Sequence, residues 1–77
     1  MTIKAYILAT TTAGKTSHAL EELRALPLVK SAVAVTGPYD VIISVEAKDL
    51  EQISRLVNEN IHHIDGVERT VTCLQWG

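Results

Sequence analysis

Residues 29–46 read VKSAVAVTGPYDVIISVE, and this stretch decides the fold. Two runs of β-branched and small apolar residues, typical of strands, flank Gly37-Pro38-Tyr39-Asp40. Gly37 accepts a positive φ and Pro38 presets φ near about −65°, so we expect the chain to reverse there. The stretch therefore predicts an antiparallel hairpin with strands over 28–36 and 39–47. Its turn is also a candidate binding site, because Tyr39 and Asp40 add a hydroxyl and a carboxylate.

Length and composition predict one small domain over residues 1–77, which gains stability from association because so short a chain buries only about 60% of its unfolded surface. The net charge is −2, and the seven Lys and Arg residues are scattered, which argues against direct nucleic-acid binding. The chain has one Cys, no signal-peptide pattern at its start and no apolar run long enough to span a membrane. These features indicate a reduced, cytoplasmic protein that does not enter the membrane.

Periodicity predicts the remaining elements. Residues 3–10 alternate in the manner of a strand, and residues 67–75 follow the turn pair Asp65-Gly66 as a last strand. Apolar residues at helical spacing predict helices over 14–26, with Thr12 as N-cap, and over 48–64. The expected buried stripes are Ala19, Leu20, Leu23 and Leu26 on the first helix and Leu50, Ile53, Val57, Ile61 and Ile64 on the second.

The predicted order is βαββαβ, so the fold class is α+β. Right-handed crossovers insert the third strand between the first two and place the fourth outside the first. The result is a ferredoxin-like fold with an antiparallel sheet of strand order 4-1-3-2 and both helices on one face.

The strands carry more apolar residues than one covered face requires. We expect the uncovered face to pack against a second copy, sheet on sheet, as a two-fold dimer. The residues expected toward the helices are Ile7, Val33, Ile43, Val45 and Val71, and those expected on the other face are Tyr6, Leu8, Ala32, Ala34, Ile42 and Leu74.

Residues 9–16, ATTTAGKT, match a relaxed phosphate-binding loop between a strand and a helix. The loop has one Gly where close approach to phosphates needs several, and so short a chain cannot supply the parallel sheet and metal-holding Asp of a nucleotide hydrolase. We interpret it as a strand-to-helix connection.

Other reactive residues do not form a catalytic or metal-binding pattern, and no cofactor is predicted. His62 and His63 are adjacent, so they project about 100° apart on a helix and do not share a metal. Cys73 is expected to be a small buried apolar residue. Trp76 is expected to cover a sheet edge or a neighbouring subunit, or to stack on a ligand.

Thr70 and Thr72 lie two residues apart on the last strand, so their hydroxyls share one face. Threonine is also an ordinary strand residue. The functional hypothesis places both on the dimer-facing side, where they bind a small polar molecule together with Asp40 and the turn amides of a neighbouring chain.

Over almost its whole length the chain resembles the effector-binding (RAM) domain of Lrp/AsnC-type regulators. The resemblance lies in Ala5-Tyr6-Ile7-Leu8, in residues 23–29 (LRALPLV), in residues 34–47 (AVTGPYDVIISVEA) and in residues 64–72 (IDGVERTVT). The Val-Thr-Gly-x-Tyr-Asp element is the most specific of these features.

The resemblance implies an amino-acid-sensing regulatory domain, not an enzyme, whose sheets pair into an α/β barrel dimer and whose dimers assemble further, commonly to octamers. It also implies an amino-acid effector at subunit interfaces. Carried over by position, Gly37 and Tyr39 would offer backbone amides, Asp40 a carboxylate for the α-ammonium, and Thr70 and Thr72 hydroxyls nearby.

Most members of the family carry an N-terminal helix-turn-helix domain, and this chain begins at the first strand. It resembles the stand-alone members, which would act through their own assembly or by mixing with full-length relatives. The start at Met1 suggests a complete protein; a fragment would belong to a DNA-binding regulator.

Two other classes share the βαββαβ order. An ACT-type regulatory domain has a Gly-rich ligand turn after its first strand, where this chain has Thr10-Thr11-Thr12. A small dimeric α+β barrel enzyme needs a sizeable apolar cavity with a positioned His or Asp, and the few aromatic residues here offer little to line one.

Overall fold

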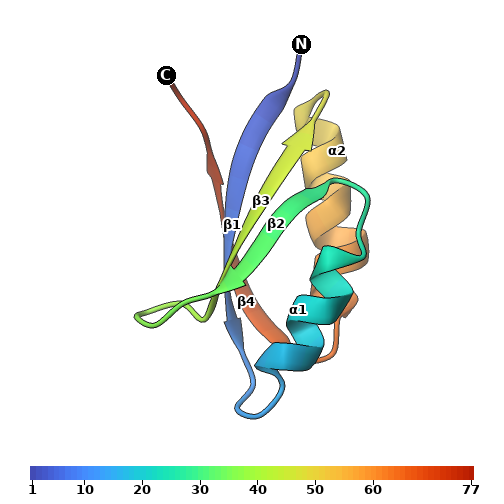
Figure 1. The fold of residues 1–77 in the computed structure, drawn as a ribbon. Coiled ribbons are helices and arrows are strands. Elements are labelled where there is room, and N and C mark those ends of the chain that lie inside the picture. Colours follow the sequence, from blue (N-terminus) through green and yellow to red (C-terminus); the bar gives the residue numbers. More distant parts are fainter.

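The computed structural model describes all of residues 1–77, and its elements follow the predicted βαββαβ order (Figure 1). None of its helices has the length and apolar character needed to cross a membrane. The strands are β1 (Ile3–Thr11), β2 (Val29–Ala34), β3 (Val41–Ala47) and β4 (Val67–Leu74). The helical elements are α1 (Thr16–Arg24), α2 (Leu50–Arg55), the π-helical segment η1 (Leu56–Asn60) and the 3-10 turn η2 (Ile61–His63).

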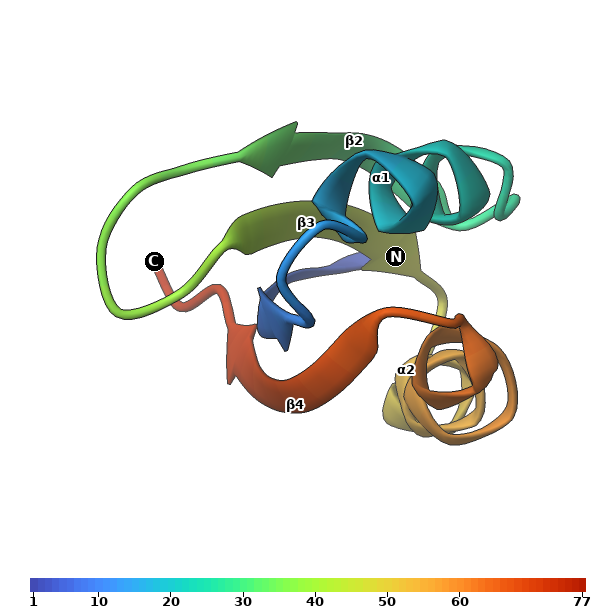
Figure 2. The ribbon, with the colours of Figure 1, turned by 90° about the horizontal axis from the view of Figure 1, so that it is seen from below.

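The four strands form one antiparallel sheet of order β2-β3-β1-β4, which confirms the predicted topology. Strand β1 is central and pairs with β3 on one edge and β4 on the other. Both helices lie on the same face of this twisted sheet, and the other face has no covering layer (Figure 2).

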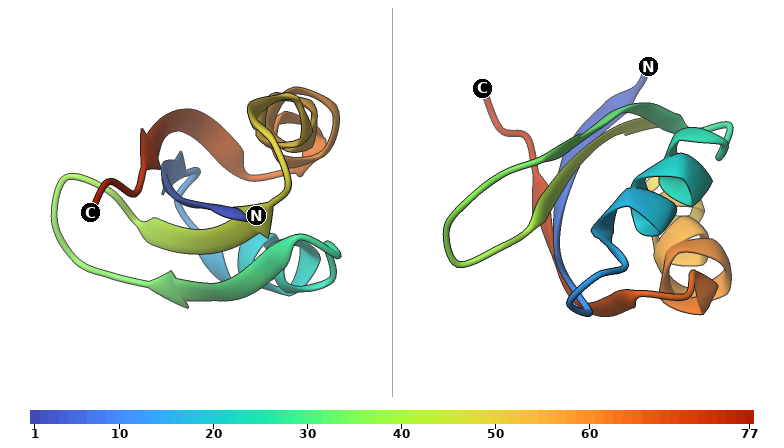
Figure 3. Two further views of the ribbon diagram at one scale, coloured as in Figure 1. Left: turned by 90° about the horizontal axis from the view of Figure 1, so that it is seen from above. Right: turned by 60° about the horizontal axis from the view of Figure 1, so that its bottom comes forward.

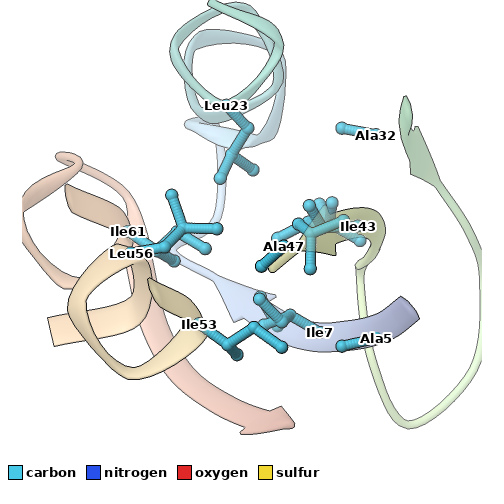
Figure 4. Close-up of a cluster of buried hydrophobic side chains, with 12 residues drawn as sticks. Ala5, Ile7, Leu23, Ala32, Ile43, Ala47, Ile53, Leu56 and Ile61 are labelled. Atoms are coloured by element: carbon cyan, nitrogen blue, oxygen red, sulfur yellow. The ribbon is translucent and has the colours of Figure 1, made fainter. Parts of the chain in front are cut away.

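The hydrophobic core lies between that face and the helices. Alternate residues of β1 and β3 point toward α1 and α2 and are buried, because side chains alternate across a strand. Burying one such aliphatic side chain contributes about 1.5–3 kcal/mol. The core cluster, drawn in Figure 4, consists of Ala5, Ile7, Ala9, Leu23, Ala32, Val41, Ile43, Val45, Ala47, Ile53, Leu56 and Ile61.

The predicted orientation of β2 is wrong. Ala32 stands opposite Ile43 and is 2% exposed, whereas Val33 stands opposite Ile42 and is 46% exposed. Ala34 pairs with the buried Val41 and so shares the helix side, although it is exposed near the strand end. The register of β2 shifts between Val29 and Ser31, and such an irregularity reverses the faces of the residues that follow.

The predicted orientation of β4 is wrong in the same way. Val71 pairs with Leu8 and faces away from the helices, and Leu74 pairs with Ala5 and lies on the helix side. Cys73 pairs with Tyr6 and is exposed, which corrects the expectation that it is buried. The uncovered side of the sheet, called the open face below, carries Tyr6, Leu8, Val33, Ile42, Val71 and Cys73.

The helices begin and end differently from the prediction. Helix α1 begins at Thr16 with Lys15 as N-cap and no side-chain cap, so the assignment of Thr12 is wrong. Helix α2 begins after Asp49, whose Oδ1 accepts a hydrogen bond from the Gln52 amide at 2.9 Å. The expected single helix over 48–64 changes into a π-helical and then a 3-10 segment.

Two residues of the second helical stretch differ from the predicted buried stripe. Leu56, absent from the predicted stripe, is buried in the core, and Leu50, which the stripe included, is 53% exposed. The other predicted stripe residues are buried or partly buried against the core.

Replacing Gly66 by Ala tests the turn before β4. Gly66 has φ of 104°, and a Cβ there would lie 2.9 Å from the Lys15 Cβ and 3.2 Å from the Lys15 carbonyl oxygen. Gly14 has φ of 83° with open space around it. Gly14→Ala should lower the free energy of unfolding by about 1–2 kcal/mol, which is the backbone strain alone, and Gly66→Ala should lower it by more. Urea unfolding at one protein concentration measures both free energies, and an equal loss would contradict the steric argument.

Candidate functional site

Residues 35–40 form the β2–β3 loop, which projects beyond the sheet on the side away from the helices (Figure 3). Its two ends are tied together because the Val35 amide donates to the Asp40 carbonyl at 2.8 Å. Asp40 also fastens the loop to β1: its amide donates to the Ala9 carbonyl at 2.9 Å, and its carboxylate Oδ2 accepts from the Thr11 amide at 2.8 Å. The loop therefore has a fixed base on the central strand.

The rest of the loop offers polar groups that the chain itself does not use. Gly37 has φ of 136°, a conformation that favours glycine. The amides of Gly37 and Tyr39 donate no hydrogen bond within the chain, and Asp40 Oδ1 accepts none. The loop thus presents two N–H donors and one carboxylate oxygen, groups suited to a small zwitterion.

A hollow of about 320 Å³ lies between the loop and the open face of the sheet. It is predominantly apolar and is lined by Leu8, Val35, Thr36, Pro38, Tyr39 and Ile42. Tyr39 therefore lines an apolar surface that continues from the loop onto the open face of the sheet.

The two threonines predicted to face the dimer lie on the other side of the sheet. Thr70 pairs with Ala9 and Thr72 pairs with Ile7, and both partners face the helices. The Thr70 hydroxyl lies 2.8 Å from His62 Nε2, so it already has a hydrogen-bond partner. The Thr72 side chain is exposed and forms no such bond within the chain. The prediction of their side is wrong, and of the two only Thr72 has an unused hydroxyl.

A groove of about 350 Å³ runs between the helical stretch and β4, and we call it the α2–β4 groove. Sequence reasoning missed it because it assigned three of the aliphatic residues to a buried stripe and Leu74 to the other face. The helix-disfavouring residues Asn58 and Asn60 were the one available signal that the helix is irregular there. The lining residues are Leu50, Ile53, Ser54, Val57, Asn58, Thr72 and Leu74.

The loop and the groove lie on opposite sides of the molecule. In Figures 1 and 2 the β2–β3 loop extends away from the body of the sheet, whereas α2 covers the opposite side. Within one chain the loop lines a hollow on the face of Leu8 and Ile42, whereas Thr72 pairs with Ile7 on the helix face. Asp40 and Thr70 lie on either side of Ala9 in β1. The Asp40 amide donates to the Ala9 carbonyl, and Thr70 pairs with Ala9 from β4.

The phosphate-loop-like stretch makes contacts that hold the turn between β1 and α1. The Lys15 ammonium donates to both carboxylate oxygens of Asp65, at 3.1 and 3.0 Å. The Thr11 and Thr16 hydroxyls lie 2.7 Å apart, and the Thr12 amide donates to the Gly66 carbonyl at 2.8 Å. The cation and hydroxyls that such a loop would offer a phosphate thus have partners in the chain.

The remaining candidates are surface residues. His62 and His63 are exposed, and no group of three or more His, Cys, Asp or Glu side chains is placed to hold a metal ion. Trp76 is 97% exposed and covers no part of its own chain.

Comparison with known proteins identifies related sequences. The model of the family described as the Lrp/AsnC ligand binding domain matches residues 4–75. The chain is 32% identical over 80 residues to the uncharacterized HTH-type transcriptional regulator PH0140 of Pyrococcus horikoshii, covering 97% of this chain and 51% of that protein. The chain therefore spans about half the length of the curated regulators that it matches first.

An enzyme and a short protein also match. The chain is 36% identical over 59 residues to homocitrate synthase of Sulfurisphaera tokodaii, covering 77% of this chain but 13% of the enzyme. Among solved structures, TTHA0845 from Thermus thermophilus has a TM-score of 0.92 and 35% identity, covering 97% of this chain and 94% of that one. The same fold thus occurs within longer proteins and in chains of about this length.

The Lys15–Asp65 pair gives a pH-dependent prediction. The hydrogen bond and the charge of Lys15 hold the pKa of Asp65 below its usual value. A carboxyl whose folded pKa is lowered stabilises the fold above its unfolded pKa of about 3.9, and this contribution is lost as pH falls through the folded pKa. In Lys15→Met the pKa of Asp65 should rise toward that unfolded value.

Titration of the Asp65 carboxyl carbon by NMR measures the shift. Lys30→Met is the matched control, since Lys30 is an exposed lysine with no ion-pair partner in the chain. An Asp65 pKa that is the same in Lys15→Met and in the unsubstituted protein would contradict the assigned cause.

Proposed function

This chain belongs to the Lrp/AsnC ligand-binding domain family, and from that premise we propose that it is a regulatory domain that senses a free amino acid. The amino acid binds between copies of the chain and acts by changing their assembly. One observation carries the proposal: unused amides on the β2–β3 loop and an unused hydroxyl in the α2–β4 groove lie on opposite sides of the molecule. A ligand that needs both must bring two copies together.

The proposed site recognises the zwitterionic part of the amino acid. The amides of Gly37 and Tyr39 donate to its α-carboxylate, and Asp40 Oδ1 accepts from its α-ammonium. Asp40 has a free oxygen for this role because only Oδ2 is used to fasten the loop. Thr72 of the other copy adds a hydroxyl, and Thr70 lies beside it, held by His62. Charge-assisted hydrogen bonds of this kind contribute about 1.5–3 kcal/mol each.

The open face supports a dimer within this proposal. Tyr6, Val33 and Val71 are 40%, 46% and 43% exposed there, on a surface that monomers seldom leave uncovered. Packing two such sheets face to face buries these side chains and gives an α/β barrel. The loop and the groove stay at the edges of that dimer, where contact between dimers builds an octamer or another closed assembly.

Full-length Lrp/AsnC regulators contain a region similar to this chain and are therefore proposed partners, with the amino acid controlling the mixed assembly in the cytoplasm. The chain itself performs no catalysis in this proposal and binds no DNA directly.

The match to homocitrate synthase favours a second candidate, in which the chain regulates an enzyme of amino-acid metabolism in trans. Both candidates use the same amino-acid site and differ in the protein that the domain joins. Affinity purification from the native cells discriminates between them: a helix-turn-helix regulator among the bound proteins supports the first, and an enzyme supports the second.

A thermal-shift panel of the twenty amino acids at millimolar concentration tests the proposed function. A ligand at about 100 times its Kd adds about 2.7 kcal/mol of apparent stability, so one amino acid or a few related ones should raise the melting temperature. No shift with any amino acid, confirmed by calorimetry, would refute amino-acid sensing.

Two substitutions of Asp40 then assign its roles. Asp40→Asn keeps an oxygen for the Thr11 amide but removes the charge, so it should preserve the loop and weaken binding about tenfold or more. Asp40→Ala should weaken binding at least as much and also lower the stability. Unchanged affinity in Asp40→Asn would show that the carboxylate does not bind the ligand.

The dimer through the open face predicts that Val33→Asp separates the chains, because a carboxylate would be buried without a partner. Ser17→Asp adds the same charge at an exposed position of α1 and should leave assembly intact. Sedimentation velocity measures the oligomeric state of both variants. A Val33→Asp protein that still dimerises like the control would contradict the sheet-on-sheet arrangement.

A further inference from the structure

The proposed site leaves the side chain of the amino acid without a binding surface, and the α2–β4 groove offers one. Thr72 belongs both to the proposed backbone contacts and to the lining of the groove. A ligand whose backbone is held at Thr72 therefore has its side chain next to the groove. Resting on the proposed function, we propose that this groove binds the effector's side chain and that the effector is an aliphatic amino acid.

The chemistry of the lining supports an uncharged occupant. Four of its residues are aliphatic, the other three are Ser54, Asn58 and Thr72, and none is charged. The ammonium group of lysine or the side-chain carboxylate of aspartate would lose hydration there without gaining an opposite charge. Moving an aliphatic side chain from water into the groove is favourable, because it removes apolar surface from water. The groove therefore favours residues such as leucine, isoleucine, valine or methionine.

The size of the groove fits a small molecule rather than a protein segment. Its volume of about 350 Å³ lies at the low end of the range of about 300–1,000 Å³ for ligand sites. Ile53 is 3% exposed and forms the floor of the groove, whereas Leu50 and Leu74 at the rim are 53% and 49% exposed. A ligand side chain in the groove would cover these two leucines and remove their apolar surface from water.

The helix is irregular beside the groove. Val57 and Asn58 belong to η1, the π-helical segment that follows α2. Such segments occur frequently at functional sites, because they change which residues a helix presents. Here Leu56 and Ile61 remain buried in the core while Val57 and Asn58 line the groove. Val57 and Asn58 thus continue the same face of the helical stretch as Ile53 and Ser54, and the groove extends along that face.

Calorimetric titration with leucine, methionine, alanine, lysine and aspartate tests the inference. Leucine or methionine should bind about tenfold or more tightly than alanine, since each methylene group in an apolar pocket contributes to discrimination. Lysine and aspartate should bind more weakly than leucine. Leu74→Ala should weaken leucine binding about tenfold and change alanine binding much less, because the alanine side chain is too short to reach the removed atoms.

Leu28→Ala is the matched control, because it makes the same truncation at a partly buried leucine outside the groove and the open face. It should lower the stability of the fold while leaving the dissociation constant of leucine within about twofold. Leu50→Glu is a second variant, placed at the exposed rim. It should raise the affinity for lysine relative to leucine by supplying the missing charge.

The outcomes separate the inference from the proposed function. Aliphatic preference with the expected responses of Leu74→Ala and Leu50→Glu supports the inference. Amino-acid binding that ranks lysine or aspartate first, or that neither variant changes, overturns the inference and leaves amino-acid sensing intact. Absence of binding by every amino acid overturns both.

Discussion

Strand β1 forms hydrogen-bonded ladders on both of its edges, and the rest of the structure depends on it. Its Ala5, Ile7 and Ala9 are at most 1% exposed beneath the helices, so the strand is held from one face and both sides. The last part of β1 also receives the base of the β2–β3 loop, because the Ala9 carbonyl accepts from the Asp40 amide. The core, the sheet order and the position of the loop thus all depend on β1.

This arrangement leaves the two faces of the sheet unequal. The helices cover one face, and the open face stays apolar and exposed, which favours association of copies. The loop and the α2–β4 groove then lie on opposite sides of the sheet in each chain, so in the proposed function one ligand in contact with both joins two chains. In the proposed function the amino acid shifts the population toward the assembled state, because it binds that state better than the separate chains.

The sequence predicted the topology but not the faces of the outer strands. Right-handed crossovers and the hairpin around Gly37 led to the sheet order that the structure has. The rule that strand residues alternate between faces did not give the correct side of β2 and β4, because both faces of each strand carry apolar residues. Either Ala32 or Val33, for example, fits the apolar pattern of the buried face. In the structure a register shift between Val29 and Ser31 determines which face of β2 meets the helices, and the sequence has no pattern that predicts this shift.

The candidate site was predictable in its loop and not in its groove. The residues of the Gly-x-Tyr-Asp stretch favour a turn through their own backbone preferences, so the loop was predictable from local sequence. The hydrogen bond from the Thr11 amide to Asp40 then requires only that β1 lies beside the loop. The groove instead lies between one face of the helical stretch and the end of β4, and predicting it required the correct side of Thr72 and Leu74. The side of Thr72 was predicted wrongly because both faces of β4 carry apolar residues, so alternation alone does not tell which face meets the helices.

The most direct test of the shared site is calorimetry on a mixture of two variants that each bind the amino acid weakly, Asp40→Asn and Leu74→Asp, after exchange of subunits in mild denaturant. One variant has a damaged loop and an intact groove, and the other has the reverse. If loop and groove come from different copies, an equal mixture should regain about a quarter of the sites with normal affinity, by random pairing of copies. No recovery in the mixture, with both parts intact in the unsubstituted protein, would contradict a site shared between copies.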